Sequence, residues 1–384
     1  MTVNRMILNE TSYFGPGAIK GITQEVQARK YQKALIVTDK DLFQFGVATK
    51  VTALLDQAGL VYEIFDGIVP NPSIEIVQAG VASCQAAKAD YIIAIGGGSP
   101  IDTAKAIGII MTNPEFSDVR SLEGVAETSA PSLPILAVPT TSGTAAEVTI
   151  NYVITDVENN RKFVCADPHD IPVVSFVDSD MMLGMPKGLC AATGMDALTH
   201  AIEGYITKGA WAMTDMLHIK AIEIIGQSLR DSVHGDANAR EAMALGQYIA
   251  GMGFSNVGLG LVHGMAHPLS AWYDVPHGVA CATLLPLIMD YNKEASGEKY
   301  RDIAQVLNVQ GAKELPLAEV RVAAVQAVKQ LGIDVGIPQN LTELGVKEGD
   351  LPKIAQDAFN DVCTPGNPRE ASVAEIIALY QAHL

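Results

Sequence analysis

The sequence lacks any uninterrupted apolar run of the roughly 18 residues that a membrane-spanning helix requires. Its N-terminus, MTVNRMILNETSYFG, also lacks the basic segment, apolar stretch and small-residue cleavage site of a secretory signal. Because 48% of the residues are hydrophobic and 18% are charged, the composition is that of a globular chain. We therefore expect a soluble protein of the cytoplasm.

Basic residues are scarce, since 26 lysines and arginines are outnumbered by 43 aspartates and glutamates, which gives a net charge of -17. Binding to nucleic acid or to an anionic membrane depends on basic groups that neutralise phosphates, so we expect neither partner. The acidic residues are spread along the chain without long blocks of like charge, as is typical of a hydrated surface.

Cysteines are few and isolated. The chain has five, an odd number, and they lie far apart with no C-x-x-C pair among them. This spacing argues against a disulfide framework and against a zinc site built from thiolates. A reducing compartment fits the pattern.

The length of 384 residues exceeds the point, about 250 to 300 residues, at which a single hydrophobic core usually stops growing, so we expect two domains. Between residues 33 and 178, strand-like runs alternate with helical stretches, which predicts a mainly parallel sheet with helices on both faces. These runs are KALIVTD, VYEIFDG, DYIIAIGGG, PILAVPTT and VVSFVDSD. Ahead of them, RMILNETSYFGPGA is predicted to form a small hairpin at the sheet edge.

After about Met185 the strand signals vanish, and apolar residues recur at helical spacing instead. We predict an α/β domain with a Rossmann-like parallel sheet over residues 1–184, and an all-helical domain over residues 185–384. The cleft between two such domains is a natural place for an active site.

A glycine-rich turn follows one of the predicted strands. In IIAIGGGSPIDTAKAIGI a buried strand runs into Gly96, Gly97, Gly98 and Ser99, and a helix follows. Glycines let the backbone approach an anion closely, and the free N–H groups at the helix start favour a phosphate. The alternative is an ordinary tight turn, and the dinucleotide fingerprint G-x-G-x-x-G is absent.

A second polar loop, VPTTSGTAAE, follows the next predicted strand. Thr140, Thr141, Ser142 and Thr144 supply hydroxyls, and Gly143 permits close approach, which suits a ribose or a pyrophosphate. Taken without the first loop, these residues are equally typical of a cluster that caps a helix.

Asp39 closes the strand-like run KALIVTD. A carboxylate there would accept hydrogen bonds from the adenosine ribose and would repel a 2′-phosphate, which favours NAD over NADP. The alternative for an aspartate at a strand end is a turn residue or a helix cap.

Three of the eight histidines lie in LVHGMAHPLSAWYDVPHGVA, residues 261–280. His263 and His267 are four residues apart, although Pro268 is expected to end or kink their helix, and His277 is placed in the loop that follows. A lone histidine on an apolar face is most often a core residue, but three together in an apolar setting punctuated by glycines favour a site.

Asp196 and His200 repeat the four-residue spacing in GMDALTHAIEG, so both side chains lie on one face of a helix. One carboxylate and neutral imidazoles suit a divalent metal such as Fe(II) or Zn(II). The spacing therefore favours a metal site over a core of histidines.

These motifs resemble the iron-dependent (group III) alcohol dehydrogenases over nearly the whole chain. The resemblance rests on NRMILNET, VPNP, AIGGGSPIDTAKAIGI, PTTSGTAAEVTINYVITD, RKFVCADPHDIP, GMDALTHAIEGYIT, GFSNVGLGLVHGMAHPL and DVCTPGNPRE. It implies the architecture shared with dehydroquinate synthase, with an NAD-binding domain followed by a helical metal-binding domain.

Carried over position by position, the resemblance implies that Asp196, His200, His263 and His277 are iron ligands. His267 would line the active site without binding the metal and would act in catalysis. The implied NAD contacts are Asp39, Asn71, Gly97, Gly98, Ser99, Thr140, Thr141, Thr144 and Lys162. The implied substrate-lining residues are Asn151, Phe254 and Cys363.

The resemblance also implies a reaction, the transfer of hydride between a short alcohol or aldehyde and NAD beside a metal that polarises the substrate oxygen. It suggests a homodimer with N-terminal strands exchanged across the two-fold axis.

Three alternatives stay open on the sequence. They are a zinc-dependent polyol dehydrogenase of the glycerol dehydrogenase type, a dehydroquinate-synthase-like lyase, and a metal-stabilised nucleotide-binding protein without catalysis. The lyase would need more basic residues around its acidic substrate than the apolar segments beside the metal-ligand candidates supply.

Overall fold

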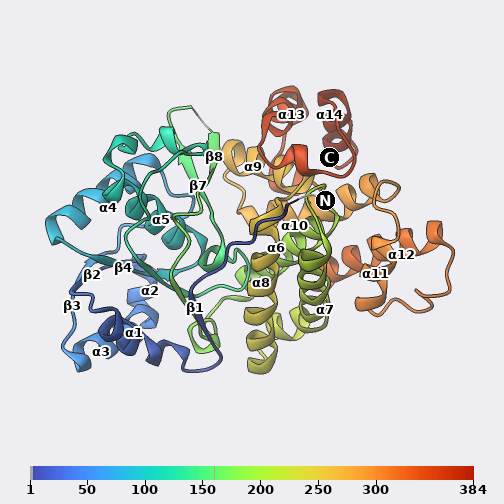
Figure 1. The fold of residues 1–384 in the computed structure, drawn as a ribbon. Coiled ribbons are helices and arrows are strands. Elements are labelled where there is room, and N and C mark those ends of the chain that lie inside the picture. The colour runs from blue at the N-terminus through green and yellow to red at the C-terminus, as the bar shows by residue number, and fades with distance from the viewer. Residues whose placement is uncertain (1–2, 160) are drawn as a thin grey trace. The chain divides into compact units, whose positions relative to one another are not determined.

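The computed structural model describes residues 3–159 and 161–384, and the chain divides into two compact units. The first unit comprises Met1–Thr141 and Ala145–Met185, and the second comprises Ser142–Thr144 and Pro186–Leu384. Figure 1 shows that the first unit contains strands and helices and that the second is built from helices. This confirms the predicted fold class.

A six-stranded sheet forms the centre of the first unit, with the order β1-β9-β6-β4-β2-β3. Every pair of neighbouring strands in it is parallel. The strands are β1 (Thr11–Phe14), β2 (Lys33–Val37), β3 (Val61–Phe65), β4 (Tyr91–Gly96), β6 (Ile135–Pro139) and β9 (Val174–Val177). All five strand-like runs predicted between residues 33 and 178 therefore belong to this sheet.

The predicted N-terminal hairpin is wrong. Only Thr11–Phe14 forms a strand there, and it pairs in parallel with β9 at the sheet edge. The described residues before Thr11 form no strand, so a single edge strand takes the place of the hairpin.

Helices cover both faces of the sheet because its central strands are apolar on both sides. Helices α1 (Ile22–Arg29) and α3 (Val47–Ala58) pack with Ile36 of β2 in one core cluster. Helices α4 (Ile74–Ala87) and α5 (Gly98–Thr112) pack with the neighbouring residue Leu35 in the other. A short helix, α2 (Lys40–Gln44), follows β2 directly.

A second, three-stranded sheet was not predicted. It has the order β5-β8-β7 and consists of β5 (Gly124–Val125), β7 (Asn151–Asp156) and β8 (Arg161–Ala166). Strands β7 and β8 are antiparallel, and their buried residues Tyr152 and Phe163 pack in a core cluster with residues of α4 and α5. The sheet thus adds a further layer outside one helical face.

The second unit contains nine α-helices among its described residues. They are α6 (Lys187–Ile206), α7 (Ala212–His234), α8 (Ala237–Val257), α9 (Leu261–Tyr273), α10 (His277–Asn292), α11 (Lys299–Val306), α12 (Leu317–Asp334), α13 (Leu351–Asn360) and α14 (Val373–Gln381). Helix α9 runs on through Pro268, so of the predicted end or kink at that residue the end is wrong and the kink stays a prediction. His277 is likewise the first residue of α10 and does not lie in a loop.

Two glycines allow α6, α7 and α8 to pack closely around one histidine. His218 of α7 is fully buried. A Cβ atom added at Gly204 of α6 would lie 2.3 Å from His218 Nε2, and one added at Gly253 of α8 would lie 2.2 Å from the same atom. The imidazole therefore occupies space that is free only because residues 204 and 253 are glycines, which have no Cβ atom.

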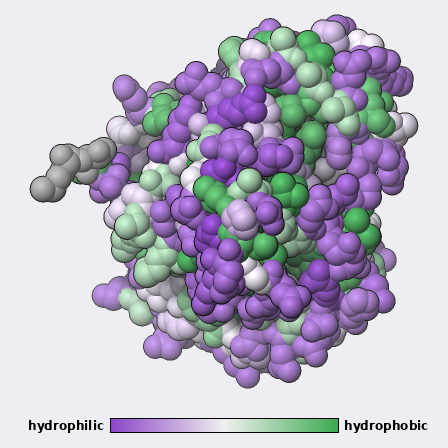
Figure 2. All heavy atoms as spheres, turned by 90° about the vertical axis from the view of Figure 1, so that its right-hand side faces the viewer, coloured by the Kyte–Doolittle hydropathy of each residue, from purple (hydrophilic) through white to green (hydrophobic). Residues whose placement is uncertain are grey.

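None of the helices in the described part of the chain combines the length and the apolar composition needed to cross a membrane. Figure 2 shows one face on which hydrophilic residues predominate and hydrophobic residues form small scattered groups. This distribution agrees with the large excess of acidic residues in the sequence.

The packing around His218 predicts opposite effects of alanine at two positions in α6. Gly204→Ala should lower the free energy of unfolding by about 1–3 kcal/mol, the usual cost of overpacking. Gly188→Ala is the matched control, because no atom lies within 4 Å of its added Cβ. It should raise the free energy of unfolding by about 0.5–1 kcal/mol through reduced chain entropy. Urea unfolding measures both, and equal shifts would contradict the packing.

Candidate functional site

The carboxyl ends of three neighbouring strands bring the predicted nucleotide residues to one edge of the large sheet. β2, β4 and β6 are adjacent and parallel, and Gly96 at the end of β4 is in register with Pro139 at the end of β6. The Thr140 N–H donates to the Gly96 carbonyl at 2.9 Å. The two polar loops therefore lie side by side, at the edge where open parallel sheets bind ligands.

The glycine turn has the geometry that a phosphate requires. Gly96 has φ +153°, and a Cβ atom there would lie 2.3 Å from Pro100 Cγ, so only glycine fits. Gly97 is the N-cap of α5 and has no side chain to cap it, and Gly98 and Ser99 are the first residues of the helix. The N–H groups at the start of α5 can therefore serve an anion.

The structure shows that Asp39 caps a helix. Its Oδ1 accepts a hydrogen bond from the Leu42 N–H of α2 at 2.8 Å, and burial raises the pKa of the carboxyl above its ordinary value. The capping alternative is thus realised in this structure. The predicted contact between Asp39 and the coenzyme ribose stays a prediction.

The remaining predicted coenzyme contacts are divided between the units. Lys162 of β8 donates to Asn71 Oδ1 at 2.6 Å, and Asn71 has a left-handed backbone with φ +56°. Thr141 belongs to the first unit, whereas Thr144 belongs to the second. The structure therefore brings Lys162 and Asn71 together and places Thr144 with the helical unit.

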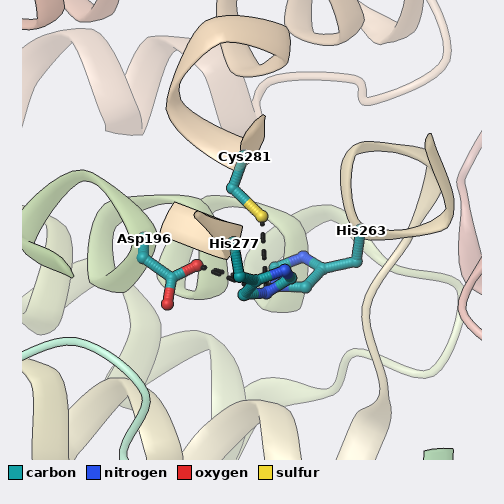
Figure 3. Close-up of side chains that lie close together, drawn as sticks. All are labelled: Asp196, His263, His277 and Cys281. Atoms are coloured by element: carbon teal, nitrogen blue, oxygen red, sulfur yellow. Dashed lines mark hydrogen bonds and ion pairs between the residues drawn. The ribbon is translucent and has the colours of Figure 1, made fainter. Parts of the chain in front are cut away.

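The second unit gathers potential metal ligands from three helices. One ligand atom each from Asp196 of α6, His263 of α9, and His277 and Cys281 of α10 lies within 4.8 Å of the other three. Figure 3 shows these side chains pointing toward one another. All except His277 are buried.

In this cluster, Asp196 Oδ1 and His263 Nε2 are buried without a hydrogen-bond partner among the described residues. They lie 3.9 Å apart, and His277 Nε2 lies 3.8 Å from the same carboxylate oxygen. These separations are too long for hydrogen bonds, yet they suit atoms that each contact one ion at about 2.0–2.2 Å. The residues therefore fit a divalent metal.

His200, the fourth predicted ligand, adjoins this cluster. It is buried one helical turn after Asp196, and its ring stacks on that of His263 with centroids 4.6 Å apart. Its Nδ1 lies 3.3 Å from the Gly143 carbonyl oxygen, so its Nε2 is the nitrogen left for a metal. Its role as a ligand stays a prediction.

Burial keeps the imidazoles of His200 and His263 neutral, which is the form that binds metals. Burial lowers the pKa of His200 to about 4 and that of His263 to about 3. Burial also raises the pKa of the Asp196 carboxyl, so a nearby cation would favour its ionised form.

The sequence reasoning did not find Cys281. Its Sγ lies 3.6 Å from His277 Nε2, and the two residues are four apart on α10, the same spacing that identified Asp196 and His200. That spacing was the available signal. Burial raises the pKa of the Cys281 thiol well above its ordinary value, so the thiol is protonated in the metal-free protein. A protonated thiol is a poor metal ligand, and the nitrogen and oxygen atoms of the cluster are therefore the better ligands.

His267 lies beside the cluster and has a carboxylate partner. Its ring stacks on His277 with centroids 5.2 Å apart, and its Nδ1 lies 2.7 Å from Asp361 Oδ2. The Cys363 N–H donates to Asp361 Oδ1 at 2.8 Å, so one carboxylate joins His267 to a predicted substrate-lining residue.

The other two predicted substrate-lining residues lie in different units. Phe254 of α8 stacks on His200 with centroids 4.2 Å apart. Asn151 begins β7 in the first unit. The structure therefore places Phe254 and Cys363 near the histidines of the second unit, and the role of Asn151 stays a prediction.

Comparison with known proteins identifies relatives over the whole chain. The model of the iron-containing alcohol dehydrogenases matches residues 9–179, and that of the C-terminal part of the same family matches residues 190–384. Lactaldehyde reductase of Escherichia coli strain K12 is 66% identical over 377 residues, which are 98% of each chain. The 1,3-propanediol dehydrogenase of Klebsiella pneumoniae is 43% identical over 98% of this chain and 97% of its own.

Solved structures give the same result. A crystal structure of 1,3-propanediol oxidoreductase superimposes with a TM-score of 0.96 at 41% identity and covers 100% of both chains. An alcohol dehydrogenase from Oenococcus oeni also has a TM-score of 0.96, at 38% identity, with full coverage of both chains. The chain therefore belongs to the iron-containing alcohol dehydrogenases, the family that its motifs predicted.

Proposed function

We propose that the protein is an NAD-dependent, iron-activated lactaldehyde reductase that interconverts lactaldehyde and 1,2-propanediol and accepts similar short alcohols and aldehydes. The 66% identity to the Escherichia coli lactaldehyde reductase over 98% of both chains carries this proposal. The family assignment favours it over a lyase and over a nucleotide-binding protein without catalysis. No observation of the site favours a zinc polyol dehydrogenase instead.

The metal ligands in this proposal are Asp196, His200, His263 and His277. The unpartnered Asp196 Oδ1 and His263 Nε2 support the assignment, because buried polar atoms normally have partners. When bound, Fe(II) supplies Lewis acidity that polarises the oxygen of an alcohol or aldehyde. Four protein ligands leave room for that oxygen, whereas further protein donors would compete with it.

His267 is proposed to move the proton. Although burial alone would raise it, the pKa of Asp361 is lowered by the neighbouring His267, so the carboxylate is ionised and accepts the Nδ1–H of His267. The Nε2 atom of His267 then keeps its lone pair and can take a proton from an alcohol during oxidation, directly or through water. The same nitrogen returns the proton during aldehyde reduction.

The first domain is proposed to bind NAD and the second the metal, over residues 1–184 and 185–384. The glycine turn at Gly96 and Gly97 would hold the pyrophosphate, and Asp39 would contact the adenosine ribose. The adjacent carboxyl ends of β2, β4 and β6 support this assignment.

The setting of the enzyme is also part of the proposal. Five free cysteines in the structure support a reducing compartment, for which we propose the cytoplasm. The edge strand β1 supports a homodimer in which this strand takes part. The breakdown of fucose and rhamnose is the pathway that would supply lactaldehyde.

Metal removal tests the proposed reaction. The freshly purified protein should oxidise NADH when lactaldehyde is added, and chelation should abolish this activity, because the substrate oxygen loses its Lewis acid. Fe(II) should restore more activity than Zn(II). Absorbance at the NADH wavelength, recorded alongside metal analysis, gives the result, and full activity in metal-free protein would contradict the proposal.

Two histidine variants separate the ligands from the proton carrier. His263→Ala should lose both metal and turnover, whereas His267→Ala should keep its metal and lose about 10²- to 10⁴-fold in rate, the usual effect of removing a general acid or base. His234→Ala is the control, since this exposed histidine lies at the end of α7, with its Nδ1 2.7 Å from the Arg230 carbonyl oxygen. Metal analysis decides: loss of iron from His267→Ala equal to that from His263→Ala would make His267 a ligand.

Asp39→Gly tests the coenzyme preference. It removes the carboxylate that repels a 2′-phosphate, so NADP(H) should be accepted and NAD(H) should bind more weakly. The loss of the α2 cap should cost only a few tenths of a kcal/mol, about the usual difference between aspartate and glycine at an N-cap. Asp41→Gly removes an exposed charge of the same helix and serves as the control. Steady-state kinetics with both coenzymes would show an unchanged preference if Asp39 is only a cap.

A further inference from the structure

Glu203 is a buried carboxylate of α6 that lies three residues after His200 and has no assigned role. Only 2% of its surface is exposed. Its Oε1 accepts the Val262 N–H at 2.7 Å, and its Oε2 lies 2.6 Å from His263 Nδ1. The His263 N–H lies 3.4 Å from the same oxygen. Both carboxylate oxygens are therefore directed at the start of α9.

The start of α9 is shaped to receive this side chain. A Cβ atom at the N-cap residue Gly260 would lie 3.0 Å from Glu203 Oε1 and 3.0 Å from Asn367 Oδ1, so glycine leaves room for both. Asn367 Oδ1 accepts the Leu261 N–H at 3.2 Å. Two side chains from distant segments thus satisfy N–H groups that a helix start leaves unpaired.

We propose that Glu203 is a positioning residue for the metal site: it caps α9 and holds the proton of His263 on Nδ1, so that the lone pair of Nε2 faces Asp196. The inference rests on the proposed metal site. The two ring nitrogens of His263 are inequivalent in the way this requires, because Nδ1 is bonded to Glu203 while Nε2 lies 3.9 Å from Asp196 Oδ1 without a partner among the described residues. A carboxylate bonded to the far nitrogen of a metal-binding histidine fixes its tautomer and orientation.

Glu203→Gln is a sharp test because the replacement has nearly the same shape but only one acceptor oxygen. If its amide nitrogen faces Val262, two N–H donors oppose each other and the cap is lost. If the amide nitrogen faces His263, it donates to Nδ1 and the ring proton moves to Nε2, where it blocks the metal. Either orientation weakens the hold on His263, because a neutral amide oxygen accepts the Nδ1 proton less strongly than a carboxylate does and an amide nitrogen reverses the bond.

Asn367→Ala is the matched control. It removes the other side chain that caps α9 but leaves the bond between Glu203 and His263 in place. Both variants should lower the thermal stability. Only Glu203→Gln should weaken Zn(II) binding, by about 10- to 100-fold, as expected for loss of a group that orients a metal ligand.

The first experiment measures Zn(II) affinity by competition with a chelator for the full chain and both variants. A wild-type affinity in Glu203→Gln would overturn the proposal, and so would an equal loss in Asn367→Ala, which would reduce Glu203 to a helix cap. If the wild-type chain itself binds no metal, the proposed function fails first.

The second experiment does not depend on any variant or metal. ¹⁵N NMR of the histidine rings in the metal-free wild-type protein reports which nitrogen of His263 carries the proton. The full chain is used, so that the contact between Glu203 Oε2 and His263 Nδ1 is intact. A proton on Nδ1 supports the proposal, and a proton on Nε2 overturns it.

Discussion

The cluster of potential metal ligands in the helical unit contains polar atoms that are buried without hydrogen-bond partners among the described residues. Asp196 Oδ1 and His263 Nε2 are both inaccessible, and neither has a hydrogen bond within the described part of the chain. Leaving a buried polar group unsatisfied costs about 1–3 kcal/mol, so the apolar packing of α6, α9 and α10 must offset that cost in the metal-free protein. A cation placed between the two atoms removes the penalty. Part of the free energy of metal binding at this site would therefore come from relieving these two unsatisfied atoms, which can each donate an electron pair to the cation.

Close approach of the helices depends on glycines that adjoin the histidines in sequence. A Cβ atom at Gly278, directly after His277, would lie 2.6 Å from the Ala192 carbonyl oxygen of α6. One at Gly264, directly after His263, would lie 2.1 Å from Thr364 Oγ1. Each glycine lets the helix that carries a histidine pack closely against a neighbouring segment. The two glycines of residues 261–280 are therefore part of what brings the imidazoles together.

Local patterns were enough to predict five of the six strands of the large sheet, the glycine turn after β4 and the spacing of Asp196 and His200, because each depends on residues close in sequence. The contact between Glu203 and His263 joins residues 60 apart, and no local period reports it. His277 was predicted to lie in a loop, but Pro276 directly before it is the N-cap of α10, and proline is common at the start of a helix. The β7–β8 hairpin was not predicted either, although buried residues alternate with partly buried ones along both strands.

Charge balance links the two carboxylates of α6. Burial pushes His200 and His263 toward their neutral forms, which suits metal binding, and it opposes ionisation of Asp196 and Glu203. A nearby divalent cation would favour the ionised form of the two carboxyl groups, but it would not favour protonation of the imidazoles. With Asp196 at a bound divalent cation and Glu203 behind His263, two negative charges would match the two positive ones. Because an uncompensated buried charge is far more costly than a paired one, a site with neutral imidazoles gains from a carboxylate beyond its direct ligand.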